Sequence, residues 1–407
     1  MAAFLHALLF LLVLLYALFK TFSLSLDEPD AFVRVKLLSQ WELEEGKALA
    51  RVRVLESELE QLEGLKGLLI LYGYPPGGRV LELFASVRLN RGSLVLSAPA
   101  YEAESVDYEP SLRDRLLARV EEALRDEELA GLAKAFLLGE ERKNLPLSLQ
   151  SSFLKTGLVH LLVVSGLHVG ILYSFFAAVL PRVPGALAGA AAAALYGFFL
   201  VPPNPPALRA TIMLILYALT VASYRRYCPL CALFFSGSVL LALFPQFSVS
   251  FSFWLSFLAV AYLIAVFKDV ELTAVRAAFL ASFAAFTGVT PLLAALTAVA
   301  PATLLLSPLL TPVVYLYALL GMLNLVTFFS FKPLVGLFEL AGLLFARSVE
   351  ALSGWAPLFL VKLSVAEGFV LSSAGLALLL LQRSLKGKLA VLLVLNAYLF
   401  TKILLGR

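Results

Sequence analysis

The sequence predicts a polytopic α-helical membrane protein that carries a small extracytoplasmic β-barrel domain. Of the 407 residues, 61% are hydrophobic and only 15% are charged, whereas a soluble domain has about 25% charged residues. From residue 152 onward the chain is a series of apolar stretches, and between residues 27 and 106 the hydrophobic period changes to two. Long apolar stretches are typical of membrane spans, and period-two patterning is typical of strands.

The N-terminal segment is apolar over residues 2–19 apart from His6, and this length is sufficient to span a bilayer. No lysine or arginine precedes it, and no small-residue cleavage site is evident before Asp27. A secretory signal peptide would have both features. We therefore expect a retained transmembrane anchor over residues 1–24.

Residues 27–106 form the predicted β domain. Alternating runs occupy residues 32–38, 48–54, 66–72, 80–89 and 93–97, with glycine and proline turns between several of them. About five short strands suit a small barrel of the OB type, a fold that binds single-stranded nucleic acid in many proteins.

The charges of this domain leave its role open. Five arginines are candidate DNA contacts: Arg34, Arg51, Arg53, Arg88 and Arg91. However, residues 27–106 hold 9 basic and 13 acidic side chains, and few aromatic ones. Phosphate binding favours a basic surface, so a spacer domain outside the cytoplasm is the alternative.

A charged, helix-prone linker follows over residues 107–150. Leucines fall mostly on one side of residues 110–140. The pattern predicts an amphipathic helix that lies on the membrane face or bridges the two domains.

The polytopic domain covers residues 151–407. Ten predicted spans lie near residues 157–180, 186–200, 207–224, 229–244, 251–267, 277–298, 303–328, 334–352, 368–382 and 389–405, which makes eleven with the anchor. Prolines at 291, 301, 308 and 312 are expected to break the chain into a re-entrant or tilted element around residues 287–312.

Basic residues set the expected orientation of these spans. They occupy alternate loops in the first half of the domain, at Arg182, at Arg225 with Arg226, and at Lys268 with Arg276. Cytoplasmic loops collect lysine and arginine, so these loops are expected in the cytoplasm. The β domain then lies outside the bacterial cytoplasmic membrane.

The net charge of residues 151–407 is +10, from 15 basic and 5 acidic side chains. The same excess would also favour a polyanionic passenger. Cys228 and Cys231 form a single C-x-x-C without a second pair or a nearby histidine. We interpret them as packing residues, and we expect no metal site and no cofactor.

The densest polar group in the apolar domain is the segment 156–170. An ideal helix would place five of its residues within about 140° of arc, namely Gly157, His160, Val164, Ser165 and His168. Gly166 and Gly170 would lie on the other side, as a small-residue face for close helix packing.

Three interpretations of this polar face compete. It could be a hydrogen-bonded patch that satisfies itself within the bundle. It could hold a nucleophilic serine, because Ser165 and His168 are one helical turn apart, although no third orienting group is evident. It could also line a wet conduction path.

The segment Phe153-x-x-Thr-Gly-Leu-Val-His160-Leu-Leu-Val-Val-Ser165-Gly-Leu-His168-Val resembles the signature of the ComEC competence family and departs from it at Val163 and Val164. Further segments resemble the family in the same order: Leu138-Gly-Glu-Glu-Arg142, Pro205-Pro-Ala-Leu-Arg209-Ala-Thr-Ile-Met213, and Leu243-Phe-Pro245 with Phe253-Trp-Leu-Ser-Phe-Leu-Ala-Val260. The last pair departs from the family pattern at Phe244 and Trp254. The resemblance covers about residues 137–330.

The resemblance implies a channel, not an enzyme, that passes single-stranded DNA across the cytoplasmic membrane during natural transformation. It also implies an external OB-like domain. Many members carry a metallo-β-lactamase-like domain, whose histidine cluster is not found after His168. Strand degradation is therefore assigned to a separate nuclease. The implied partners are membrane lipids, an extracytoplasmic DNA receptor and a cytoplasmic helicase-like ATPase, since no P-loop is evident here.

The expected lining of the DNA path consists of His160, Ser165, His168, Arg209 and Asn324. Arg209 is the expected phosphate contact because it follows Pro205-Pro206 and has no acidic residue nearby in sequence; the alternative is that it reaches the membrane interface. An intramembrane serine hydrolase that uses Ser165 and a small-solute transporter are the alternative functions.

Overall fold

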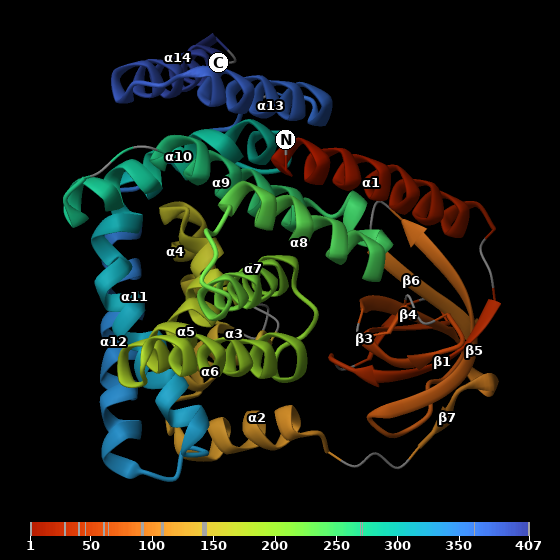
Figure 1. The fold of residues 1–407 in the computed structure, drawn as a ribbon. Coiled ribbons are helices and arrows are strands. Elements are labelled where there is room, and N and C mark those ends of the chain that lie inside the picture. Colours follow the sequence, from red (N-terminus) through yellow and green to blue (C-terminus); the bar gives the residue numbers. More distant parts are fainter. Residues whose placement is uncertain are drawn as a thin grey trace. The chain divides into compact units, whose positions relative to one another are not determined.

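The computed structural model describes residues 2–27, 30–39, 41–44, 46–59, 62–63, 65–90, 93–106, 110–140, 145–268, 270, 272–361 and 363–405 (Figure 1). The chain divides into two compact units, and each is described by itself. The first unit comprises residues 1–112 and 234–251, and the second comprises residues 113–233 and 252–407.

Five long strands of the first unit close into a barrel (Figure 1). The strands are β1 (Asp30–Leu37), β2 (Glu42–Glu44), β3 (Lys47–Ser57), β4 (Lys66–Tyr72), β5 (Val80–Asn90), β6 (Ser93–Pro99) and β7 (Glu104–Ser105). Neighbours run in the order β1-β3-β4-β6-β5, and β1 also pairs with β5, which closes the ring. The pair β4–β6 is parallel, whereas the other pairs are antiparallel.

The barrel interior follows from the period of two in the sequence. Along β1 and β3 every second side chain is buried, and Val33, Val35, Val52 and Val54 have no exposed surface. Alternate residues of a strand point to opposite faces, so these valines fill the core while the charged residues between them point outward. The prediction of about five strands in a small barrel is confirmed.

The N-terminal helix α1 (Ala2–Asp27) packs within the first unit along one narrow stripe. Phe10 contacts Phe234 of α8 (Pro229–Leu243) with ring centroids 5.7 Å apart. Thr21 Oγ1 lies 3.4 Å from Ser248 Oγ of the short helix η6 (Pro245–Val249). Most other side chains of residues 3–20 are at least partly exposed, as expected for a helix that faces lipid.

The second unit is helical. Its helices are α2 (Leu112–Ala123), α3 (Glu127–Leu138), α4 (Leu147–Thr156), η4 (Leu158–Leu161), α5 (Gly166–Val179), α6 (Arg182–Ala194), η5 (Leu195–Leu200), α7 (Pro205–Ala222), α9 (Phe251–Phe267), α10 (Ala274–Ala294), α11 (Thr303–Val326), α12 (Lys332–Ser353), α13 (Val365–Leu381) and α14 (Leu385–Leu405).

Five helices in the described part of the chain are long and apolar enough to cross a membrane. They are Ala3–Thr21, Arg182–Leu200, Pro205–Ala222, Ala274–Ala294 and Thr303–Val326. Four further apolar helices, α5, α8, α9 and α13, are shorter, with 14 to 17 residues. A full span needs about 20 apolar residues. By length and composition, the structure therefore supports five of the eleven predicted spans.

The predicted span over residues 157–180 is not one helix. Helix α4 ends at Gly157, whose φ of 71° is left-handed, η4 follows, and α5 begins only at Gly166. The arc calculated for an unbroken helix therefore does not apply to Gly157, His160 and Val164.

Residues 110–140 also differ from the predicted amphipathic helix. They form two helices, and every residue from Leu129 to Leu138 of α3 except Lys134 is buried. The side chain of Arg113 donates to the Leu138 carbonyl oxygen from Nε at 3.0 Å and Nη2 at 2.9 Å. Helix α3 is therefore part of the core, and Arg113 satisfies one of its terminal carbonyl groups.

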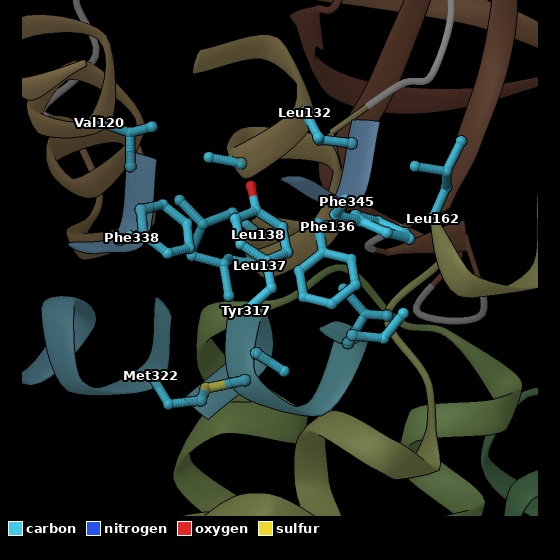
Figure 2. Packing of buried hydrophobic residues seen from close by; sticks show 14 of the residues in the cluster. Val120, Leu132, Phe136, Leu137, Leu138, Leu162, Tyr317, Met322, Phe338 and Phe345 are labelled. Atoms are coloured by element: carbon cyan, nitrogen blue, oxygen red, sulfur yellow. The ribbon is translucent and has the colours of Figure 1, made fainter. Parts of the chain in front are cut away.

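That core is a dense aromatic cluster (Figure 2). Phe136 of α3 lies 4.8 Å from Tyr317 of α11 between ring centroids, and Tyr317 stacks on Phe338 of α12 at 4.6 Å. Phe345 of α12 contacts the same group. These rings join α3 to α11 and α12.

The prolines of the second half act differently from the prediction. Pro291 lies inside α10, and Pro308 and Pro312 lie inside α11. The chain leaves the helical conformation around Pro301, where Val299 and Phe359 exchange backbone hydrogen bonds of 2.8 and 2.9 Å. Helices tolerate proline where neighbouring groups satisfy the freed backbone.

Candidate functional site

Gly157 is required at the end of α4 by both conformation and space. Its left-handed φ of 71° favours glycine, and an added Cβ would lie 2.9 Å from Ala300 Cβ and 3.0 Å from Thr303 Cβ. Its carbonyl oxygen accepts hydrogen bonds from Thr303 Oγ1 at 3.3 Å and pairs with His160 Nδ1 at 3.0 Å. Gly157 therefore joins η4 to the start of α11, while the side chain of His160 is exposed.

Ser165 and His168 cap the N-terminus of α5. Ser165 Oγ accepts from the Leu167 N–H at 3.2 Å, and the Ser165 N–H donates to His168 Nδ1 at 3.2 Å. This reciprocal pair is a capping box in which histidine replaces the usual glutamate or glutamine. Ser165 Oγ lies 3.4 Å from the same Nδ1, whose lone pair already accepts the backbone N–H.

His168 is buried in the aromatic core, with 0% of its surface exposed. Its ring meets Phe136 edge-on, with centroids 4.3 Å apart. His168 Nε2 has no hydrogen-bond partner among the residues that the structure describes. A buried polar atom without a partner costs about 1–3 kcal/mol, so this signature residue is not fully satisfied in the state observed.

Arg209 is buried on α7, with 7% of its surface exposed. Its Nε donates to Ser256 Oγ of α9 at 3.0 Å, and its Nη1 lies 3.5 Å from Met213 Sδ. Among the described residues no carboxylate lies within ion-pair distance of this guanidinium, and both of its hydrogen-bond partners are neutral. An arginine stays charged in proteins, so Arg209 is a buried cation whose charge no described carboxylate balances.

Asn324 has a structural place at the end of α11. Its Nδ2 donates to the carbonyl oxygens of Leu320 at 3.0 Å and of Leu334 in α12 at 3.2 Å. Asn324 Oδ1 is buried and has no hydrogen-bond partner within the described part of the chain. The side chain therefore fixes the α11–α12 connection and keeps one acceptor free.

The predicted glycine face of α5 does not form as expected. A Cβ on Gly166 would contact Ala210 Cβ at 3.2 Å, whereas one on Gly170 would meet nothing within 4 Å. The close approach occurs instead on α6, where a Cβ on Gly189 would lie 2.7 Å from the Tyr173 carbonyl oxygen and one on Gly185 would lie 2.9 Å from that of Phe176. The Gly185-x-x-x-Gly189 spacing is a recognised packing signal that could have identified it.

The barrel arginines that were predicted as DNA contacts differ in their surroundings. Arg34 is paired with Glu56 at 2.7 Å and with Glu82, and the hydrogen bond to Glu82 raises the pKa of Arg34. Arg53 lies opposite Lys36, and Arg51 follows two residues away on the same face of β3. Arg88 is exposed on β5 and pairs with Val95 of β6, whereas Arg91 lies outside the described residues.

The barrel also exposes aromatic side chains, which a count of its charged residues does not reveal. Tyr72, Tyr74 and Tyr101 are exposed, and Lys47 Nζ lies 5.4 Å from the centroid of the Tyr72 ring. Exposed tyrosines beside basic groups are typical of stacking surfaces for single-stranded nucleic acid.

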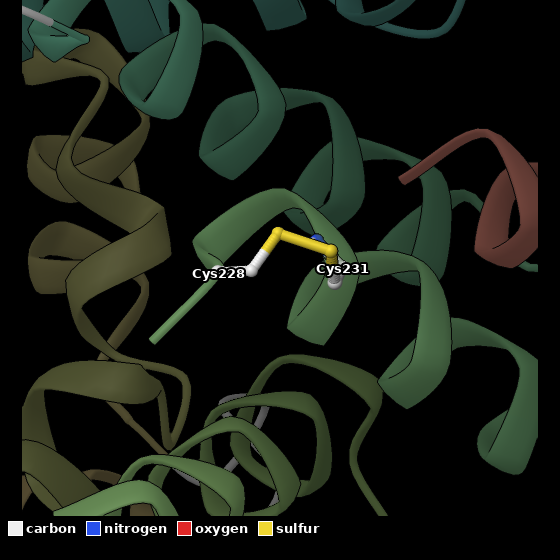
Figure 3. The surroundings of a disulfide bond; sticks show 2 residues. All are labelled: Cys228 and Cys231. Carbon is white, nitrogen blue, oxygen red and sulfur yellow. A yellow bond between two sulfur atoms is a disulfide. The ribbon is translucent and has the colours of Figure 1, made fainter. Parts of the chain in front are cut away.

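Cys228 and Cys231 form a disulfide at the start of α8, which corrects their interpretation as packing residues (Figure 3). Their Cα atoms lie 5.3 Å apart, and Cys228 is exposed. The disulfide therefore closes the first turn of α8.

The structure thus joins Ser165 to His168 at one helix end and places Arg209 and Asn324 on other helices. These features define a class of protein, one with several candidate membrane spans, an accessory β-barrel and a buried cationic site. The sequence model of the Competence family, described as competence protein, matches residues 136–388. The chain belongs to this family, which points to a role in DNA uptake for competence.

A relative matches this chain over nearly its whole length. An uncharacterized protein of Aquifex aeolicus (strain VF5) is 42% identical over 400 residues, which cover 98% of this chain and 97% of the relative. The similarity therefore includes the barrel and the helical unit. No solved structure matches this chain.

Proposed function

We propose that the helical unit is a channel that passes one strand of DNA across the bacterial cytoplasmic membrane during natural transformation. Family membership supports DNA uptake, and five candidate spans support a position in the membrane. In this proposal the chain has no catalytic role and uses no cofactor.

The burial of Arg209 beside neutral partners is the observation that supports this proposal most strongly. Its guanidinium is buried beside Ser256 Oγ and Met213 Sδ, and residues 151–407 carry a net charge of +10. A phosphodiester strand brings one negative charge for each nucleotide. A phosphate at Arg209 would balance the charge and form a charge-assisted hydrogen bond.

In this proposal the observed conformation corresponds to a closed channel. His168 has no exposed surface and touches Phe136 of α3, so a strand can pass it only after α3 or α5 moves. Opening would give His168 Nε2 and Asn324 Oδ1, which have no partners in the closed state, access to water or DNA. Ser165, His160 and Asn324 then act as uncharged lining.

The barrel is proposed to be of the OB type and to lie outside the cytoplasmic membrane. A closed ring of five strands with a parallel β4–β6 pair supports this fold. Arg51 and Arg53 share one face of β3 and supply its proposed phosphate contacts. Arg34 contributes less because its charge is neutralised by Glu56 and Glu82.

The proposed partners supply what the channel lacks. An extracytoplasmic receptor delivers DNA, and a cytoplasmic helicase-like ATPase does the mechanical work because the chain has no P-loop. A separate nuclease degrades the other strand. Membrane lipids surround the candidate spans.

The test is DNA uptake by Arg209 variants in a transformable host whose own channel gene is deleted. A hydrogen bond to a charged group contributes about 1.5–3 kcal/mol, so Arg209→Gln is expected to lower transformation about 10- to 150-fold. Arg209→Lys retains the charge and should fall less.

The matched control is Arg182→Gln, which removes one positive charge from an exposed position at the start of α6. Its uptake should equal that of the wild type. Equal uptake by Arg209→Gln, at equal protein level in the membrane, would remove Arg209 from the DNA path. Labelling of Ser165 by a serine-reactive fluorophosphonate, lost in Ser165→Ala, would instead favour the hydrolase.

A further inference from the structure

The turn between α7 and α8, residues 223–228, presents an aromatic and two basic side chains. Tyr224 is 83% exposed, and Arg225 and Arg226 are exposed beside it. In the described part of the chain neither guanidinium forms an ion pair. We call this segment the α7–α8 turn.

The backbone of the turn is fixed in a costly conformation. Tyr224 has a φ of 53°, which is uncommon for a residue other than glycine. The Arg225 N–H donates to the Thr220 carbonyl oxygen at 2.9 Å, and the Tyr224 N–H donates to that of Val221 at 3.3 Å. Strained conformations persist where the surrounding structure determines them, and they cluster at binding sites.

Two further contacts hold the other end of the turn. The Tyr227 hydroxyl donates to the Met213 carbonyl oxygen at 3.4 Å. The disulfide between Cys228 and Cys231 then closes the first turn of α8, where the Cys231 N–H also donates to Cys228 Sγ (Figure 3). A surface that is ordered before binding loses less entropy when a ligand arrives.

A row of side chains leads from this turn to Arg209. Arg209, Met213 and Tyr217 are spaced by four positions on α7, which places them along one face of the helix. Met213 Sδ touches Arg209, and the Tyr217 ring meets Tyr227 edge-on with centroids 5.2 Å apart. The row therefore runs from the buried cation to the exposed turn.

We propose that the α7–α8 turn is a contact surface for single-stranded DNA at one mouth of the path, with Tyr224 as a base-stacking platform and Arg225 and Arg226 as phosphate contacts. This inference rests on the proposed function and adds residues to it. Aromatic side chains interleaved with basic ones bind single strands without sequence preference.

Anionic lipid headgroups are the competing ligand, because tyrosine and arginine also gather at membrane interfaces. A headgroup would need only the exposed turn. The inward row of Tyr227, Tyr217 and Met213 leads to a second cation, and a polymer with regularly spaced phosphates can occupy both sites. We therefore assign the turn to DNA.

The experiment measures binding of a fluorescent oligothymidylate of about 12 nucleotides to the full-length protein in phosphatidylcholine nanodiscs. Tyr224→Asn removes the ring and suits the left-handed backbone. Stacking of one base contributes about 1–3 kcal/mol, so the affinity should fall about 5- to 150-fold. Tyr224→Trp should restore it.

The contribution of Arg225 and Arg226 is measured separately, from the salt dependence of binding. Arg225→Gln with Arg226→Gln should reduce the slope of log affinity against log salt by about 1.4, because each phosphate contact on a single strand contributes about 0.7. The control, Arg182→Gln with Lys332→Gln, removes two exposed charges elsewhere and should leave the slope unchanged. Tyr315→Ala is the control for loss of an exposed tyrosine on α11.

The outcomes separate the two proposals. If the wild type binds the strand and the turn variants match their controls, the turn is not a DNA contact and the channel proposal stands. If the wild type binds no strand and admits none, both are overturned. If the turn variants lose only the binding of phosphatidylglycerol vesicles, the turn is a headgroup site and this inference is wrong.

Discussion

At the scale of single residues, the signature segment contains the residues that end helix α4 and begin helix α5. Gly157 ends α4 with a left-handed φ, and its space is closed by Ala300 and Thr303. Ser165 and His168 start α5 through a reciprocal cap. The motif therefore sets the chain direction at two breaks, in addition to any contact with DNA.

Two glycines of the segment give opposite predictions. Gly157→Ala should destabilise the fold, since the left-handed conformation alone costs about 1–2 kcal/mol and the added Cβ meets Ala300 Cβ at 2.9 Å. Gly170→Ala is the matched control, because its Cβ would meet nothing within 4 Å. Alanine is favoured over glycine inside a helix by about 0.5–1 kcal/mol, so this variant should be slightly more stable.

Thermal unfolding of both variants in detergent checks the pair. A Gly157→Ala protein as stable as the wild type would mean that the left-handed turn and its contacts at Ala300 do not hold in solution. A destabilised Gly170→Ala protein would mean that Gly170 packs closely against a neighbour, as the sequence pattern had predicted.

At the scale of elements, the α7–α8 turn combines features that favour different compartments. Disulfides persist in oxidising surroundings, and Cys228 is bonded to Cys231. Arginines collect in cytoplasmic loops, and Arg225 and Arg226 are both exposed in this turn. Basic residues occur in alternate loops, at Arg182 and again at Lys268 with Arg276, and this pattern leads us to expect the α7–α8 turn on the cytoplasmic side.

Thiol labelling in intact cells checks this orientation. After reduction, the exposed Cys228 should react with a membrane-permeant maleimide and be protected from an impermeant one. A cysteine introduced at Tyr74, exposed on the barrel, is the control and should react with both in a Cys228→Ser, Cys231→Ser background. Reaction of Cys228 with the impermeant reagent would place the α7–α8 turn outside and reverse the orientation.

The sequence predicted the barrel better than the helices, for a physical reason. Strand patterning depends on neighbours two residues apart, so the alternation of buried valines, Val33 with Val35 in β1 and Val52 with Val54 in β3, is visible in the sequence. A uniformly apolar segment has no such contrast. The break of the predicted span 157–180 depends on contacts with Ala300 and Thr303, which are distant in sequence.

In the candidate site, too, the sequence predicts single residues but not their contacts with residues distant in sequence. Arg209 was identified from its own neighbourhood, since a charge in an apolar segment is conspicuous. Its partner Ser256 lies on α9 and could not be predicted. Tyr217 has a local signal, because it follows Arg209 at helical spacing, but only the structure brings Tyr227 beside it.

At the scale of the whole molecule, the helical unit combines a packed core with a buried charge. Phe136 packs against Tyr317 and Phe345 (Figure 2) and also meets the ring of His168, whereas Arg209 lacks an acidic partner among the described residues. Packed cores tend to switch between discrete arrangements instead of deforming smoothly. If the helical unit is a DNA channel, a strand can therefore pass only after an opening transition.

Flux of single-stranded DNA into proteoliposomes is the decisive measurement for the proposed channel. Purified full-length protein is reconstituted, labelled oligothymidylate is added outside, and nuclease-protected label is counted inside. If the protein is a DNA channel, protected label is expected with the wild type, much less with Arg209→Gln, and none in protein-free liposomes. Failure of the wild type to admit any strand, when a driving ATPase or an internal single-strand-binding protein is supplied, would contradict it.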